Sequence, residues 1–279
     1  MEEGHIVVPF LISKGNVVDI LFIITIFLIG FIGSFISGMV GVGGSIIKYP
    51  MLLFIPPLLG FATFTAHEVA GISAVQVFFA TIAGVWAYRG TGYLHKQLIV
   101  YMGASILLGS FIGAFASNLL QESAVNVVYA VLATIAAIMM FLPKKQLPDQ
   151  PAQHITFHKG LAASLSFVVG VASGIVGAAG SFLLVPIMLT VLKLPTRVTI
   201  ATSLAVMFIS SIGSTVGKVA TDQVLYGPAI VMIIASVISA PFGAKLGQKM
   251  NTKILKWILA ILILASSLQI WWDILRGLL

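Results

Sequence analysis

Ten apolar stretches, separated by short polar connections, run along almost the whole length of the chain. Only 8% of the 279 residues are charged, whereas an average soluble domain carries about 25%. Such a chain lacks the polar surface that a water-soluble globule of this size needs, so we expect lipid to be its solvent. Because the stretches leave no room for a separate catalytic domain, the sequence predicts an all-α polytopic membrane protein that is not an enzyme.

The apolar stretches fall into two sets of five, separated by a polar linker that contains proline. They span residues 17–39, 45–59, 66–88, 97–118 and 123–142, and then 160–177, 181–193, 198–217, 226–244 and 254–272. The predicted organisation is therefore an N-terminal repeat at 1–143, a cytoplasmic linker at 144–159 and a C-terminal repeat at 160–279.

The two sets carry the same motif. SGMVGVGGSIIKYPML at 37–52 aligns with SGIVGAAGSFLLVPIM at 173–188, and the two share serine, glycine and proline positions in one register. Farther on, Ser73 pairs with Ser203 and Phe78 with Phe208, and the Gly-Ala pairs at 113–114 and 243–244 also match. The sequence thus predicts a duplicated unit of five apolar segments.

Five segments are an odd number, so the second repeat is expected to be inverted relative to the first. If the segments alternate in direction, one face of the membrane carries eleven basic residues: Arg89, Lys96, Lys144, Lys145, Lys159, Lys193, Arg197, Lys245, Lys249, Lys253 and Lys256. The other face carries Lys14, Lys218 and Arg276. Since basic loops stay in the cytoplasm, this asymmetry predicts that both termini are periplasmic. If the first two segments of each repeat, which a glycine-rich motif separates, are instead counted as a single crossing, the basic residues divide almost evenly between the two faces.

The second and seventh segments are too short to cross alone. The stretch 181–193 gives roughly 20 Å of helix, against a hydrocarbon core of about 30 Å. Each of these two short segments is expected to pair with the segment before it in a broken-helix hairpin. The glycine-rich tip of the hairpin would lie near the midplane of the membrane. The unpaired N–H groups of a helix that begins there suit an anion. Two such tips around one pocket would be typical of a secondary transporter.

The candidate substrate-binding residues lie in the two glycine-rich motifs and on the helices that follow them. They are Gly41, Gly43, Gly44, Ser45, Lys48, His67, Ser73, Gln76, Gly177, Gly180, Ser181, Arg197, Thr202 and Ser203. The glycines would let a ligand approach the backbone, and the ammonium of Lys48 would neutralise an anion. Glu68 is a candidate carrier of a coupling proton.

Each candidate also has a structural explanation. The glycines could serve close helix packing, as expected at Gly109/Gly113, Gly213/Gly217 and Gly243/Gly247. The motif serines could cap helices, and Lys48 could snorkel to the interface. His67 and Arg197 could be solvated at helix ends, while the uncharged polar residues could form hydrogen bonds between helices. The sequence leaves these alternatives open.

The duplicated motif followed by proline, the Ala-Thr-Ser-Leu run at 201–204 and the two Gly-Ala pairs resemble the TauE/SafE sulfite exporter family over nearly the whole chain. The resemblance implies a bacterial inner-membrane transporter that exports sulfite, sulfoacetate or a related organosulfonate. Ala178-Ala179 and Gly71-Ile72-Ser73 depart from the family's usual pattern, so the substrate stays open. Import or channel-like uniport of another small organic anion is the alternative.

The expected partners are a small anionic substrate and the lipid bilayer. The net charge of +7 does not indicate a nucleic-acid partner, because the basic residues lie in short loops. No metal or other cofactor is expected, since the chain has no cysteine and since His154 and His158 have no carboxylate beside them. A homo-oligomer, the coupling ion and the direction of transport stay open.

Overall fold

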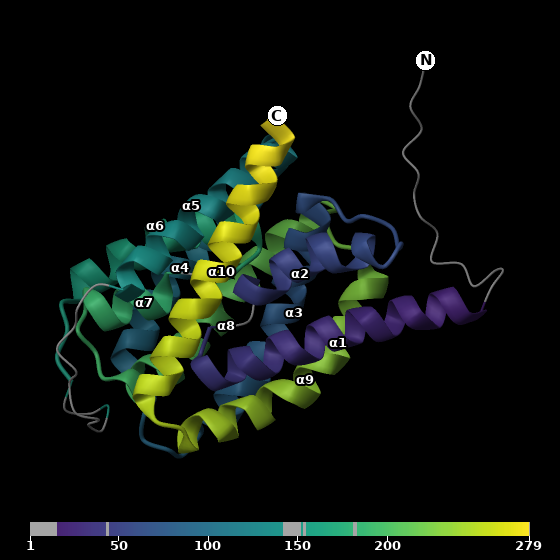
Figure 1. Ribbon diagram of the computed structural model, residues 1–279. Coiled ribbons are helices and arrows are strands. Elements are labelled where there is room, and N and C mark those ends of the chain that lie inside the picture. The colour runs from purple at the N-terminus through teal and green to yellow at the C-terminus, as the bar shows by residue number, and fades with distance from the viewer. Residues whose placement is uncertain (1–15, 43–44, 142–151, 153–154, 181–182, 279) are drawn as a thin grey trace.

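The computed structural model describes residues 16–42, 45–141, 152, 155–180 and 183–278, and its regular elements are all helices in these ranges (Figure 1). The α-helices are α1 (Asn16–Val40), α2 (Ser45–Leu58), α3 (Ala66–Ala87), α4 (Lys96–Ala116), α5 (Glu122–Phe141), α6 (Lys159–Val176), α7 (Leu184–Thr190), α8 (Thr196–Ala220), α9 (Tyr226–Lys249) and α10 (Thr252–Leu278). A 3-10 turn, η1 (Ser117–Leu119), follows α4. The prediction of an all-helical protein is confirmed.

Eight of these helices are long and apolar enough to cross a membrane, and α2 and α7 are the two short ones. The ten helices follow the ten predicted apolar segments in order. The candidate residues Gly43, Gly44 and Ser181 lie outside the described residues, as does most of the predicted linker. A meeting of the two motif tips, Gly44 and Ser181 included, therefore stays a prediction.

Small residues let the long helices pack backbone against backbone. A Cβ atom added to Gly113 on α4 would overlap the carbonyl oxygen of Val171 on α6. On the other side of the bundle, a Cβ at Gly243 on α9 would overlap the carbonyl of Phe35 on α1. Gly109, Gly213, Gly217 and Gly247 are equally close to a neighbouring helix. The predicted close-packing role of these six glycines is confirmed.

Helices α3 and α8 cross at the centre of the bundle and run in opposite directions. The rings of Phe78 on α3 and Phe208 on α8 lie 5.4 Å apart. Toward the N-terminus of α3, the carbonyl of Ala74 accepts a hydrogen bond of 3.1 Å from Thr215, which lies toward the C-terminus of α8. Helices α3 and α8 are therefore antiparallel.

The other long contacts come in matching pairs. Helix α1 packs along α9 in the same direction, since Gly30 lies beside Met232 and Met39 beside Gly247. Helix α6 packs along α4 in the same way, and these are the two most extensive helix contacts in the described part of the chain. In Figure 1, α1 and α9 accordingly lie side by side at one edge of the bundle.

Hydrogen bonds to a backbone carbonyl that a proline leaves free hold the short helix α2 between α5 and α10. Pro50 has no N–H, so the carbonyl of Ile46, four residues earlier, receives no helical hydrogen bond from it. The hydroxyls of Tyr129 on α5 and Ser266 on α10 donate to this carbonyl instead, at 2.6 and 2.9 Å. The ring of Tyr49 stacks on Tyr129 at 4.4 Å. These contacts fix the orientation of α2 and therefore of Lys48, which lies on it.

Candidate functional site

Lys48 on α2 points into the protein and has no solvent exposure. Its stem lies against Gly33 of α1, where a Cβ would overlap the lysine Cγ. The ammonium donates hydrogen bonds to Ser34 Oγ on α1, at 3.1 Å, and to Gln76 Oε1 on α3. Snorkelling, which was the structural alternative for this residue, would require the ammonium to reach the interface. The buried amine excludes that explanation for this conformation.

The partners of Lys48 are joined to one another. Gln76 Nε2 donates to Ser34 Oγ at 3.1 Å and to Ser236 Oγ on α9 at 2.6 Å. Ser34 also donates to Ser236, at 2.7 Å, and Ser236 donates to the carbonyl of Met232. We call Ser34, Lys48, Gln76 and Ser236 the Lys48 cluster. Gln76 and Ser236 stand near the middle of α3 and α9, so the cluster lies halfway along the bundle.

The Lys48 cluster contains one basic side chain and no acidic one. The acidic residues within the described ranges all lie in loops or near helix ends: Asp19, Glu68, Glu122, Asp222 and Asp273. Within the described residues, the hydrogen-bond partners of the Lys48 ammonium are the neutral side chains of Ser34 and Gln76. An ammonium has three N–H donors, so one of them is left for another acceptor.

Unused hydroxyls lie next to the Lys48 cluster. Six fully buried serines have hydroxyl oxygens with no hydrogen-bond partner in the described part of the protein, and three of them are close in sequence to cluster members: Ser45, Ser73 and Ser239. Each stands three residues from a cluster member on its own helix, and residues at this spacing share a helix face. The surroundings of the cluster thus offer neutral donors in addition to the cation.

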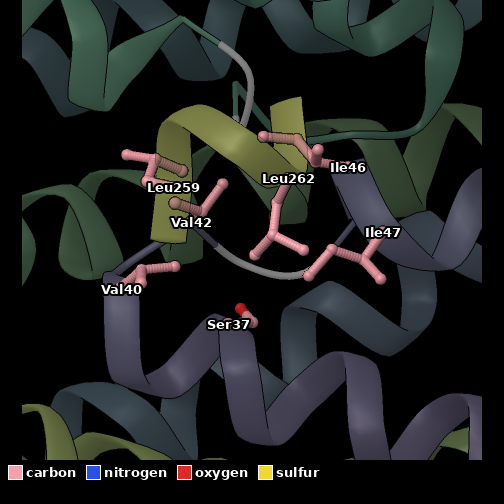
Figure 2. Close-up of a pocket in the computed structure, with 7 residues that line it drawn as sticks. All are labelled: Ser37, Val40, Val42, Ile46, Ile47, Leu259 and Leu262. Atoms are coloured by element: carbon pink, nitrogen blue, oxygen red, sulfur yellow. The ribbon is translucent and has the colours of Figure 1, made fainter. Parts of the chain in front are cut away.

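The hollow behind the first glycine motif is too small and too apolar for an anion. It has a volume of about 10 Å³, which is near the minimum for one water molecule. Figure 2 shows the seven residues that line it: Ser37, Val40, Val42, Ile46, Ile47, Leu259 and Leu262. Ser37 is the only one of the seven with a polar side chain. This hollow is therefore not a site for a polar ligand.

Gly41 and Gly177 turn the chain where α1 and α6 end, and both have the positive φ angle that favours glycine, +76° and +70°. Gly41 lies against the backbone of Ile200 on α8, and Gly177 against that of Ala70 on α3. Ser203 Oγ strengthens the first contact by donating to the Gly41 carbonyl at 2.8 Å. These contacts are helix packing, which was the structural alternative for the two glycines.

The same contacts separate Gly41 from Gly177. Ala70 and Ile200 each precede the Phe78–Phe208 crossing by eight residues on their own helix, or about 12 Å. Since α3 and α8 are antiparallel, the two glycines lie on opposite sides of the crossing. One small anion therefore cannot contact both of them in this conformation. Gly180, also with a positive φ, packs against the apolar side chains of Ile106 and Leu184.

The remaining candidates at the helix starts hold neighbouring chain segments. Glu68 completes a capping box with Thr65, with hydrogen bonds of 2.8 and 3.2 Å. His67 contacts the carbonyl of Leu120 at 3.1 Å and the amide oxygen of Gln223 at 3.3 Å. These contacts explain the positions of both residues without a ligand.

The corresponding residues of the second repeat have similar contacts. Arg197 donates to the carbonyl of Gln248. Thr202 Oγ1 accepts a hydrogen bond from the backbone N–H of His95 at 3.1 Å, just before α4 begins. Of the predicted site residues, the structure thus joins Lys48 to Gln76 and places Ser45 and Ser73 one turn away.

A second buried lysine, Lys218, was predicted on the outer face but lies inside the protein with no solvent exposure. Its ammonium donates to Ser117 Oγ at 2.7 Å, the Ile175 carbonyl at 2.9 Å and Gln223 Oε1 at 2.7 Å. These acceptors use all three of its donors, and the Ile175 carbonyl belongs to the last turn of α6, where the helix dipole favours a cation. The contacts of Lys218 therefore hold neighbouring segments together and leave no donor for a ligand.

Sequence comparison identifies the chain at the level of its family. It is 24% identical over 260 residues to the probable membrane transporter protein YunE of Bacillus subtilis, covering 87% of this chain and 94% of that protein. A probable membrane transporter protein of Xylella fastidiosa is 23% identical over 253 residues, covering 90% and 95%. No solved structure matches. The Sulfite exporter TauE/SafE family profile matches residues 26–270, so the chain belongs to this family of membrane transporters.

Proposed function

We propose that the protein is a secondary transporter that exports a small sulfur-containing anion, such as sulfite, sulfoacetate or a related organosulfonate, across the bacterial inner membrane. In this proposal the Lys48 ammonium binds the anion. The observation that carries it is the full burial of Lys48 among neutral partners. Family membership supports the choice of substrate class.

The energetic argument rests on the missing counter-ion. A charged side chain halfway across a membrane protein is expensive unless an opposite charge or several hydrogen bonds compensate it. The Lys48 cluster supplies two hydrogen bonds and no anion. A bound oxyanion would accept the third N–H of the ammonium and could accept hydrogen bonds from nearby serine hydroxyls. With a monoanion bound, the binding site would be electrically neutral.

Alternating access requires two halves that can exchange roles, and the proposed inverted repeat provides them. The antiparallel crossing of α3 and α8, which are equivalent helices, supports the inversion. The equivalent contacts of α1 with α9 and of α6 with α4 support it too. Leu184 takes the place of Lys48 in the second repeat, so the proposed transporter has a nearly symmetric scaffold and one cation.

The inverted topology predicts which residues face each side of the membrane. The chain has no cysteine, so single-cysteine variants report one position each. Lys253→Cys should react with a membrane-impermeant maleimide only from the cytoplasm, and Ser123→Cys only from the periplasm; both residues are exposed. Labelling of both variants from the same side would contradict the topology and, with it, the periplasmic termini.

The role of Lys48 is tested by replacing it with methionine, which keeps an apolar stem and removes the charge. We expect Lys48→Met to weaken sulfite or sulfonate binding roughly tenfold or more, because a charge-assisted hydrogen bond is lost. Efflux from proteoliposomes should fall in parallel. The matched control is Lys253→Met, which removes one exposed charge at the start of α10 and should leave both measurements unchanged. Parental binding by Lys48→Met would refute the proposed role.

A further inference from the structure

We propose that the Lys48 site selects singly charged oxyanions over doubly charged ones of the same size. The inference rests on the proposed function, because it assumes that the anion binds at Lys48. It concerns the charge of the transported species, which membership of the family does not specify. For sulfite, the species bound would be hydrogensulfite. A sulfonate without a second acidic group, such as methanesulfonate, is a monoanion at any physiological pH. Within the proposed substrate class, the inference therefore favours hydrogensulfite and such sulfonates over sulfoacetate, which also carries a carboxylate.

The first step is the charge of the site. Lys48 contributes a single positive charge, and its partners Ser34, Gln76 and Ser236 are neutral. The other fully buried lysine that the structure describes is Lys218, whose three donors are already used by Ser117, Ile175 and Gln223. A second positive charge is therefore not available to a ligand at the Lys48 cluster.

The second step concerns the charged and titratable side chains on the surrounding helices. Most such residues on these helices lie within about two turns of a helix end. On α1, α3, α5, α8, α9 and α10 they are Asp19, His67, Glu68, Glu122, Arg197, Lys218, Tyr226, Lys245, Lys249, Lys253, Lys256, Asp273 and Arg276. Tyr49 and Tyr129 lie deeper, and their hydroxyls donate to Asn126 and to the Ile46 carbonyl. Among the described residues, Lys48 is thus the one basic or acidic residue at the centre of the bundle, where the cluster lies.

The third step is the cost of an unmatched charge. A monoanion bound to Lys48 gives a neutral complex, whereas a dianion leaves one negative charge buried with no cation to balance it. Hydroxyl and amide donors reduce that cost, yet they do not cancel a net charge in a low-dielectric interior. The dianion also gives up more hydration when it enters the site. Both effects favour the monoanion.

Methanesulfonate and sulfate provide a matched pair for the test, since both are tetrahedral and of similar size. Methanesulfonate has a methyl group where sulfate has a fourth oxygen, so it carries one negative charge instead of two. Binding of each to the purified full-length protein is measured by the rise in melting temperature with ligand concentration. We expect methanesulfonate to bind at least about tenfold more tightly than sulfate. Equal or tighter binding of sulfate would overturn the inference while leaving the proposed function intact.

A pH series with sulfite provides the second arm. The affinity for total sulfite, divided by that for methanesulfonate at the same pH, should fall by roughly tenfold for each pH unit above the second pKa of sulfurous acid, because the monoanion fraction falls in that proportion. Any change in the protonation of Lys48 affects both ligands and cancels in the ratio. A ratio that stays constant with pH would refute the inference. Absence of binding by every anion would instead refute the proposed function.

Discussion

Replacing Gln76 by leucine should destabilise the protein by about 1–3 kcal/mol, because removing one hydrogen-bond partner of a buried ammonium leaves an N–H donor unsatisfied. Gln76 is the amide that joins Lys48, Ser34 and Ser236, and leucine has a similar volume without a polar atom. The Lys48 ammonium would keep a single hydrogen bond, to Ser34. The measurement is the melting temperature of the purified variant without ligand.

The double variant Lys48→Met/Gln76→Leu provides the control. Replacing both polar partners by apolar groups of similar shape can be nearly neutral, so the double variant should be more stable than Gln76→Leu alone. Such a reversal would show that the damage in the single variant comes from an unpaired buried cation. If the two effects simply add, the lysine is not charged or not held by Gln76, and the electrostatic argument for anion binding fails.

Replacing Gly177 by alanine should have an effect as large, through backbone packing. A Cβ at this position would overlap the carbonyl oxygen of Ala70, a backbone atom that cannot move aside easily. The positive φ of +70° adds strain of roughly 1–2 kcal/mol for a residue with a side chain. We expect loss of folded protein or of transport, assayed by the amount of monodisperse protein after purification and by efflux.

Gly90→Ala is the matched control for Gly177→Ala. Gly90 also has a positive φ, +83°, but an added Cβ would meet no atom within 4 Å. Its substitution therefore measures backbone strain alone. The difference between the two variants isolates the contact of Gly177 with α3. Equal effects of both substitutions would show that this contact contributes little.

The order and approximate bounds of the helices could be predicted well from the sequence, because the length of a membrane-crossing apolar segment is set by the bilayer. The ten segments and the two short helices followed from this constraint alone. The length of α8 was underestimated: it continues through Lys218 to Ala220, where a lysine was taken to mark a loop. A buried lysine with three acceptors from other segments leaves no local signal in the sequence.

The site was predicted in part. Lys48 and Gln76 were identified separately, as a cation and a polar group within apolar segments. That they hydrogen-bond to each other depends on the packing of α1, α2, α3 and α9, which adjacent sequence does not specify. Ser34 and Ser236 were missed because single serines are common in membrane helices; only their position among apolar residues could have suggested a role. Gly41 and Gly177 were predicted to let a ligand approach the backbone, but the atoms that lie against them belong to Ile200 and Ala70.

The location of a bound anion is the most direct test of the account. An experimental structure of the full-length protein with methanesulfonate should show a sulfonate oxygen within roughly 2.7–3.2 Å of Lys48 Nζ. Ser34 and Gln76 should remain hydrogen-bonded to the same ammonium, as they are without ligand. A sulfonate bound elsewhere, with Lys48 still bonded only to Ser34 and Gln76, would contradict the assignment of this lysine as the anion-binding group.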